Sequence, residues 1–279
     1  MDATKISKMA KTQRRYLMYW AEIDNKVYDN VSLETIQKYN IKTYGEMLVG
    51  DIPFTKYLSK AKTLHSPKNK TFCIGYNKTG TTSLEYYFRA LGYNVPCQQT
   101  QESILTDAVY KGNFNKVKEF ISDYDFFQDM PFSQEDWWIV ADVLFPNSKF
   151  ILTIREEQSW YTSYYNWHKS VLGFDTPTLD YIKNNTNYIH NKYIYNINKR
   201  QVSYAENTLL KQNWDNLYNK DLLIDLYTKR NTRIMSYFQD RDNLLVIDLS
   251  KEEDTRKILD FLDIDKNLIC KMPHVNRSR

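Results

Sequence analysis

Short apolar runs alternate with longer amphipathic stretches along most of the chain from Thr71 onward. The short runs have the length of buried strands, and the longer ones repeat apolar residues at helical spacing. The pattern predicts strands at Phe72–Ile74, Tyr93–Val95, Asp125–Gln128, Lys149–Ile154 and Leu244–Asp248. It predicts helices at Thr82–Leu91, Thr100–Val109, Phe114–Ser122, Ser133–Leu144, Gln158–His168, Leu222–Phe238 and Glu252–Leu262.

This β-α alternation predicts an α/β domain over residues 71–279, with a parallel sheet of about five strands flanked by helices. Ligands of such sheets bind beyond the carboxyl ends of the strands. The loops that follow Ile74, Gln128, Ile154 and Asp248 are therefore the places to look for chemistry.

Two segments fall outside the alternation. Residues 1–70 are expected to form a helical N-terminal extension, with Ser32 capping one helix and a boundary near Ser66-Pro67. Residues 169–222 are rich in Tyr, Asn and Trp and are expected to form a helical insertion. Because the insertion is too long for a plain connection, it is a possible lid over an acceptor.

The loop from Gly75 to Thr82 joins a predicted strand to a predicted helix. That arrangement directs backbone N–H groups and the positive end of a helix at an anion. The spacing Gly75-x4-Gly80 is P-loop-like, but Thr81 stands where an NTPase has its lysine. The lysine lies earlier, at Lys78, so the loop suits a shorter anion than a triphosphate with Mg²⁺.

A second anion site is predicted at the end of the strand Lys149–Ile154. Arg155 offers a planar guanidinium for a phosphate, and Ser163 follows on the next helix. Two anion sites in one fold are what a bisphosphorylated nucleoside needs.

Composition narrows the choice of partners. The net charge of +4 on 279 residues is mild and gives no reason to expect nucleic acid binding. Cys73, Cys97 and Cys270 are far apart and odd in number, which favours reduced thiols over a disulfide frame or zinc site. No signal peptide or membrane span is recognisable, so we expect a cytoplasmic protein without membrane contact.

The residues resemble the sulfotransferases that use 3′-phosphoadenosine 5′-phosphosulfate (PAPS) and release 3′-phosphoadenosine 5′-phosphate (PAP). The resemblance is carried by Lys78-Thr79-Gly80-Thr81-Thr82, by Arg155 with Ser163 and its context Ser163–His168, and by the C-terminal stretch Asn243 to Asn276. It implies that Lys78, Gly80, Thr81 and Thr82 bind the 5′-phosphosulfate, and that Asn77, Thr79 and Ser83 of the same stretch also belong to the donor-binding site. It implies that Arg155 and Ser163 bind the 3′-phosphate, and that Lys78 is catalytic because it stabilises charge on the bridging oxygen. No metal is implied.

The chain departs from this family in places that affect the mechanism. Many members carry a base histidine before Leu-Pro, where this chain has Gln128-Asp129-Met130-Pro131, so Asp129 is the candidate base. The alternatives are that Asp129 only shapes a turn, or that His168 is the base. Ser83 replaces an aromatic that stacks on adenine, which leaves Tyr86, Tyr87 or the insertion to cover it. The usual Arg-Lys-Gly run is missing, and Arg277 and Arg279 are possible substitutes.

The predicted activity is transfer of a sulfuryl group to a hydroxyl, or as second choice an amine, of a small-molecule or carbohydrate acceptor. One alternative is a P-loop NTPase or small-molecule kinase, because Leu244–Asp248 has the apolar-run-then-Asp pattern of a Mg²⁺-binding strand. Another is a nucleotide-binding module without turnover. The acceptor is not identified by the sequence.

Overall fold

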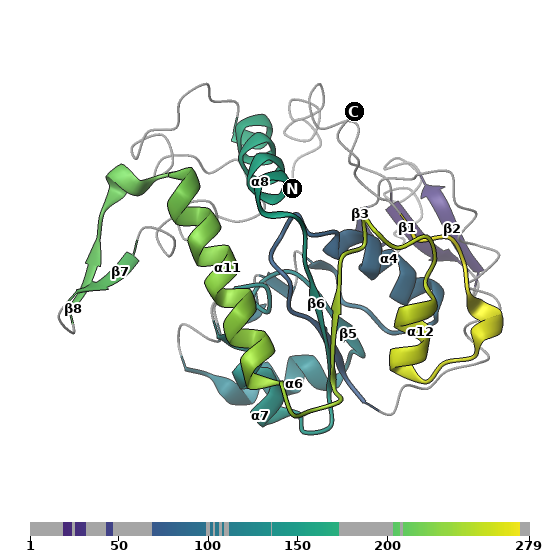
Figure 1. Ribbon diagram of the computed structural model, residues 1–279. Helices are drawn as coiled ribbons and strands as arrows, with labels where there is room; N and C mark the ends of the chain where they lie inside the picture. The colour runs from purple at the N-terminus through teal and green to yellow at the C-terminus, as the bar shows by residue number, and fades with distance from the viewer. Residues whose placement is uncertain are drawn as a thin grey trace, which may run out of the picture.

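A computed structural model provides the fold (Figure 1). It describes residues 69–98, 112–134, 136–172 and 209–273, and the short stretches 19–23, 26–31, 43–46 and 203–206. It also describes single positions between 101 and 108. The predicted α/β class is confirmed, because a parallel sheet lies between helices.

The central sheet has the strand order β5-β4-β6-β9, and every neighbouring pair is parallel. Its strands are β4 (Thr71–Cys73), β5 (Phe126–Phe127), β6 (Lys149–Thr153) and β9 (Leu244–Ile247), each within or beside a predicted strand. The chain passes from β4 to one neighbour, β5, and then returns to the other side as β6. Such a reversal places ligands at the carboxyl ends of the strands on either side of it.

Helices cover both faces of the sheet (Figure 1). The helices α4 (Thr81–Ala90) and α12 (Arg256–Leu262) pack on one face. The helices α6 (Phe114–Ser122), α7 (Trp137–Leu144) and α11 (Lys220–Tyr237) pack on the other. Helix α8 (Glu157–Leu172) follows β6 and contacts α11. Short 3-10 turns lie at η1 (Trp214–Asn216) and η2 (Lys266–Leu268).

The core has two layers because both faces of the strands are buried. Phe72 packs into the layer under α6, α7 and α11, whereas its neighbour Cys73 packs under α4 and α12. Aromatic rings fill the first layer: Phe72 stacks on Phe127 at 5.1 Å and on Phe150 at 5.6 Å between ring centroids. Continuous apolar runs in the sequence are the expected signature of strands buried on both faces.

Helix starts follow local capping chemistry. Asn113 caps α6 by accepting a hydrogen bond from the Lys116 N–H, and Asn219 caps α11 by accepting one from the Leu222 N–H. These bonds satisfy N–H groups that a helix leaves without an internal partner.

The predicted strand at Tyr93–Val95 is not formed. The segment lies beside β5, where the Asn94 carbonyl accepts hydrogen bonds from the N–H groups of Asp125 and Phe126. The Asn94 N–H, however, donates to the Asp125 side chain, and Pro96 has no N–H to continue a ladder. The described parallel sheet therefore has four strands instead of about five.

The predicted all-helical character of the two outer segments is corrected where the structure describes them. The N-terminal extension contains an antiparallel sheet of β1 (Tyr19–Ile23), β2 (Lys26–Val31) and β3 (Thr43–Glu46). The insertion begins as the end of α8 and contains a hairpin of β7 (Ser203–Glu206) and β8 (Leu209–Gln212). In each hairpin, two residues of the chain separate the paired strands. The helix predicted at Ser32 and residues 173–202 lie outside the described residues.

Candidate active site

The loop between β4 and α4 packs unusually close to β6, and two glycines make this possible. A Cβ added to Gly75 would lie 2.0 Å from Thr153 Oγ1 and 2.4 Å from the Thr153 carbonyl oxygen. Gly80 has a φ of 97°, and a Cβ there would lie 2.8 Å from Leu249 Cδ1. At Gly75 a larger residue would meet main-chain atoms of β6 and displace the loop, whereas at Gly80 the positive φ is what favours glycine.

Inside the loop, Asn77 and Thr79 hold the main chain in place. The Thr79 hydroxyl donates to the Tyr76 carbonyl and lies 2.6 Å from Thr153 Oγ1, so Thr153 is the donor to Thr79. Asn77 Oδ1 accepts from Gln134 Nε2, and the Asn77 carbonyl accepts from Trp160 Nε1. Both were predicted to bind the donor, but their side chains bond within the protein. Their contribution to anion binding would come from backbone N–H groups.

Lys78 lies at the turn of the loop and has a φ of 70°. Its ammonium lies over the Trp167 ring, 5.2 Å from the centroid, and its carbonyl accepts from Arg155 Nη1 at 3.4 Å. Burial lowers the pKa of Lys78 to about 8, opposed by the Asp129 carboxylate and reinforced by the Arg155 charge. At neutral pH most Lys78 side chains therefore remain cationic in a desolvated site, where a positive charge acts strongly on an anion.

The predicted contacts Thr81, Thr82 and Ser83 form the first turn of α4. N–H groups in the first turn of a helix point out of its N-terminal end, where the helix dipole is positive. Thr81 and Ser83 are buried and Thr82 is half-buried.

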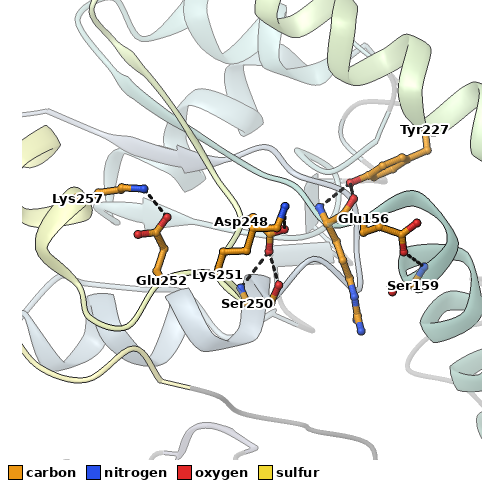
Figure 2. Close-up of polar contacts among 9 residues, drawn as sticks. Glu156, Ser159, Tyr227, Asp248, Ser250, Lys251, Glu252 and Lys257 are labelled. Atoms are coloured by element: carbon orange, nitrogen blue, oxygen red, sulfur yellow. Dashed lines mark hydrogen bonds and ion pairs between the residues drawn. The ribbon is translucent and has the colours of Figure 1, made fainter.

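Arg155 lies two residues after the end of β6 and is held through its main chain. Its N–H donates to the Tyr227 hydroxyl at 2.9 Å, and the same hydroxyl donates to its carbonyl at 3.0 Å. Next to it, Glu156 accepts from the N–H groups of Gln158 and Ser159 and so opens α8. Figure 2 shows the bond with Ser159. The half-buried Ser163 lies two helical turns further on, and no hydrogen bond joins it to Arg155 in the described part of the chain. The structure therefore brings Arg155 to Lys78 and leaves the role of Ser163 a prediction.

Asp129 follows β5 and is held in a left-handed conformation with a φ of 59°. The residue is 8% exposed, and its carboxylate accepts from Gln98 Nε2 at 3.1 Å and from the Ser133 hydroxyl at 3.3 Å. Burial raises its pKa to about 6, although the bond from Ser133 and the Lys78 charge favour the ionised form. A carboxylate with this pKa is a better proton acceptor near pH 7 than an ordinary aspartate.

Comparison with known protein families identifies the group to which this site belongs. A family model described as a sulfotransferase domain matches residues 70–279. The chain belongs to the sulfotransferase family. A search of curated proteins finds no match. Membership of this family supports sulfuryl transfer as the general activity. The matched residues include all three loops described above.

Other candidate residues of this sulfotransferase have structural roles. His168 is fully buried, its Nδ1 lies 2.8 Å from the Tyr218 hydroxyl, and burial lowers its pKa to about 3. Tyr86 and Tyr87 are 3% exposed, so neither presents a face to an adenine ring. Asp248 accepts from the N–H and hydroxyl of Ser250, at 3.0 and 2.6 Å, and pairs with Lys251 (Figure 2). Arg277 and Arg279 lie outside the described residues.

Three supporting residues of the sulfotransferase site were not predicted. Arg230 on α11 donates to the carbonyls of Ile74 and Phe132, which belong to the loops after β4 and β5. Tyr227, one turn earlier, holds Arg155. Gln98 reaches Asp129 from the segment before α6. No motif marks these residues, because their partners are main-chain or side-chain atoms far away in the sequence.

Within the described ranges, no group of three or more His, Cys, Asp or Glu side chains is arranged to hold a metal ion. None of the helices that the structure describes has the length and apolar character needed to cross a bilayer.

Proposed function

We propose that the protein transfers a sulfuryl group from PAPS to a hydroxyl group of a small-molecule or carbohydrate acceptor, with an amine as second choice. The observation that carries this proposal is the contact between the loops after β4 and β6. The Arg155 guanidinium lies 3.4 Å from the Lys78 carbonyl, and its charge acts on the Lys78 ammonium, so the two loops carry neighbouring cations. A donor with a 5′-phosphosulfate and a 3′-phosphate has two anionic groups for two such cations.

The residues support an in-line displacement. The acceptor oxygen would form a bond to sulfur while the bond between sulfur and the bridging phosphate oxygen breaks, and PAP would leave. Lys78 is suited to stabilise the negative charge on that oxygen, because its ammonium is desolvated and already placed. Asp129 would take the proton of the acceptor hydroxyl, and its raised pKa supports this role.

The first alternative, a P-loop NTPase or kinase, is disfavoured by two features. Thr81 occupies the place of the phosphate lysine. Asp248, the candidate Mg²⁺ ligand, is bonded to Ser250 and Lys251 of its own turn. The second alternative, a module without turnover, is disfavoured by the buried Asp129, whose pKa responds to the Lys78 charge.

Calorimetric titration with PAP and, separately, with ATP and Mg²⁺ tests the donor. We expect micromolar or tighter binding of PAP and at least tenfold weaker binding of ATP with Mg²⁺. Binding of ATP with Mg²⁺ in preference to PAP would overturn the proposal.

The base is tested by Asp129→Asn, which keeps the shape of the side chain and removes the proton acceptor. We expect PAP affinity to stay within about threefold, while PAP release from PAPS in the presence of phenol and sugar acceptors falls by about 10²-fold or more. Unchanged turnover in this variant would show that Asp129 is not the base.

The lid role of residues 169–222 and a cytoplasmic location remain part of this proposal. The free thiols of Cys73, Cys97 and Cys270 are consistent with a reducing compartment.

A further inference from the structure

Polar side chains from one short segment cover the turn that carries Asp129. The segment carries Gln98, Gln101 and Glu102, whose i, i+3, i+4 spacing places side chains on one helical face. All three residues are helical in the structure. Gln101 and Glu102 are 2% and 0% exposed. Such buried polar groups are costly unless they are bonded to specific partners.

Gln101 holds the main chain on both sides of Asp129. Its Nε2 donates to the Gln128 carbonyl at 2.7 Å and to the Met130 carbonyl at 2.6 Å. Asp129 between them has a φ of 59°, a strained conformation for a non-glycine residue that persists where neighbours enforce it. The two bonds from Gln101 supply that enforcement.

Gln98 acts on the carboxylate itself. Its Nε2 donates to Asp129 Oδ2 at 3.1 Å and to Glu102 Oε1 at 2.8 Å, while its Oε1 accepts from Gln128 Nε2 at 3.2 Å. Gln128 Nε2 also donates to Glu85 Oε2 at 2.9 Å. The orientation of the Gln98 amide is thereby fixed, because a flipped amide would place its oxygen against the Asp129 carboxylate and its NH2 group against that of Gln128.

We propose that Gln98 is a positioning residue for the base: its amide fixes the direction of the Asp129 carboxylate and favours its ionised form. The proposal rests on the role of Asp129 given above. The bond to Asp129 Oδ2, together with the Ser133 hydroxyl on Oδ1, holds the carboxylate at both oxygens. A fixed carboxylate meets the acceptor hydroxyl without reorganisation in each turnover.

The charges around Asp129 allow a clear prediction of sign. Lys78 after β4 favours the ionised carboxylate, whereas Glu85 on α4 disfavours it. Glu102 on the covering segment and the Cys73 thiol of β4 also interact with Asp129. Removal of the Gln98 donor takes away a hydrogen bond to the charged form and leaves the neighbouring carboxyls in place, so the pKa of Asp129 should rise.

The test is a pH titration of the Asp129 carboxyl in the Gln98→Leu variant. The titration is monitored by NMR of protein labelled with ¹³C at the aspartate carboxyls. The Asp129 signal is assigned by its absence in Asp129→Asn. We expect the midpoint to rise by about one pH unit, the shift that loss of one charge-assisted hydrogen bond produces. The acidic limb of the pH profile for PAP release from PAPS should rise with it, with PAP affinity within twofold of wild type.

Two further variants keep the test decisive. Gln239→Leu makes the same change at an exposed position after α11 and should leave the midpoint in place. If Gln98→Leu does not fold, Gln98→Glu keeps the length and the acceptor for Gln128, removes the donor and adds charge. It should shift the midpoint upward at least as far.

An unmoved midpoint in a folded Gln98 variant, with Asp129→Asn inactive, would overturn the role of Gln98 alone. An equal shift in Gln239→Leu would also overturn it. Full turnover by Asp129→Asn would instead overturn the base assignment, and the role of Gln98 in transfer with it.

Discussion

Replacement of Gly75 by alanine tests whether the close packing of the loop on β6 is what shapes the anion site. The new Cβ would lie 2.4 Å from the Thr153 carbonyl oxygen and 2.8 Å from its nitrogen. Both are main-chain atoms of β6, in a residue that pairs with Ile247 of β9, so they cannot rotate away. The loop would have to move by about 1 Å to reach an ordinary contact distance, and the hydroxyl pair between Thr79 and Thr153 would lengthen with it.

The expected cost has two opposing parts. Overpacking of this kind destabilises the folded protein by about 1–3 kcal/mol. Alanine also reduces the conformational entropy of the unfolded chain, which stabilises the folded protein by about 0.4–1 kcal/mol. The net loss of about 1–2 kcal/mol predicts a fall in Tm of about 2–8 °C. A 1 Å displacement of N–H donors should cost more in function, so we expect at least tenfold weaker binding of PAP by calorimetry.

Gly112→Ala is the matched control. A Cβ at Gly112 meets nothing within 4 Å, but its φ of 66° strains alanine by about 1–2 kcal/mol. The two variants should therefore lose similar stability, while the Gly112 variant binds PAP like wild type. The reasoning is refuted if Gly75→Ala keeps wild-type affinity, or if both variants lose affinity equally.

Three further predictions concern single side chains. Lys78→Met removes the ammonium and keeps its length, so turnover with PAPS should fall by about 10²–10³-fold with a smaller change in KM, measured by PAP release. Arg155→Ala should weaken PAP by about tenfold or more and leave adenosine 5′-phosphate unchanged in parallel titrations; equal losses would exclude contact with the 3′-phosphate. His168 has its pKa lowered to about 3 in the folded protein, so the unfolded state binds the extra proton between about pH 3 and 6.5. Stability should thus fall on acidification below pH 6.5, by about 1 kcal/mol per unit near pH 5, and His168→Asn should flatten this slope in urea titrations.

The anion-binding loop could be predicted because its signal is local. Gly75, Lys78 and Gly80 lie between a strand and a helix, and that order alone sets the direction of the N–H groups. The direction of the Asn77 and Thr79 side chains could not be predicted in this way. Their partners Gln134 and Thr153 are distant in sequence and become neighbours only after the sheet forms.

The strands of the sheet were predicted where they are buried on both faces, and the errors lie in short amphipathic segments. Tyr19–Ile23 and Ser203–Glu206 are too short for their period to separate helix from strand. Along the chain, only two residues separate each of these strands from the strand it pairs with. That short connection indicated a hairpin better than the apolar period did. Tyr93–Val95 failed for a different reason, since the Asn94 N–H is taken by the Asp125 carboxylate.

Helix α11 contacts each of the three loops at the carboxyl end of the sheet. Tyr227 bonds to the main chain after β6, and Arg230, one turn later, bonds to the main chain after β4 and near the end of the turn after β5. Because these bonds converge on two residues of one helix, the loops cannot open one at a time. To open any one of these loops, the bonds to α11 must break, and the free energy of detaching α11 is a cost common to all three. The three loops are therefore a single cooperative unit of local unfolding. Sequence changes in the middle of α11 would therefore alter the rigidity of the whole site at once, without touching a reacting atom.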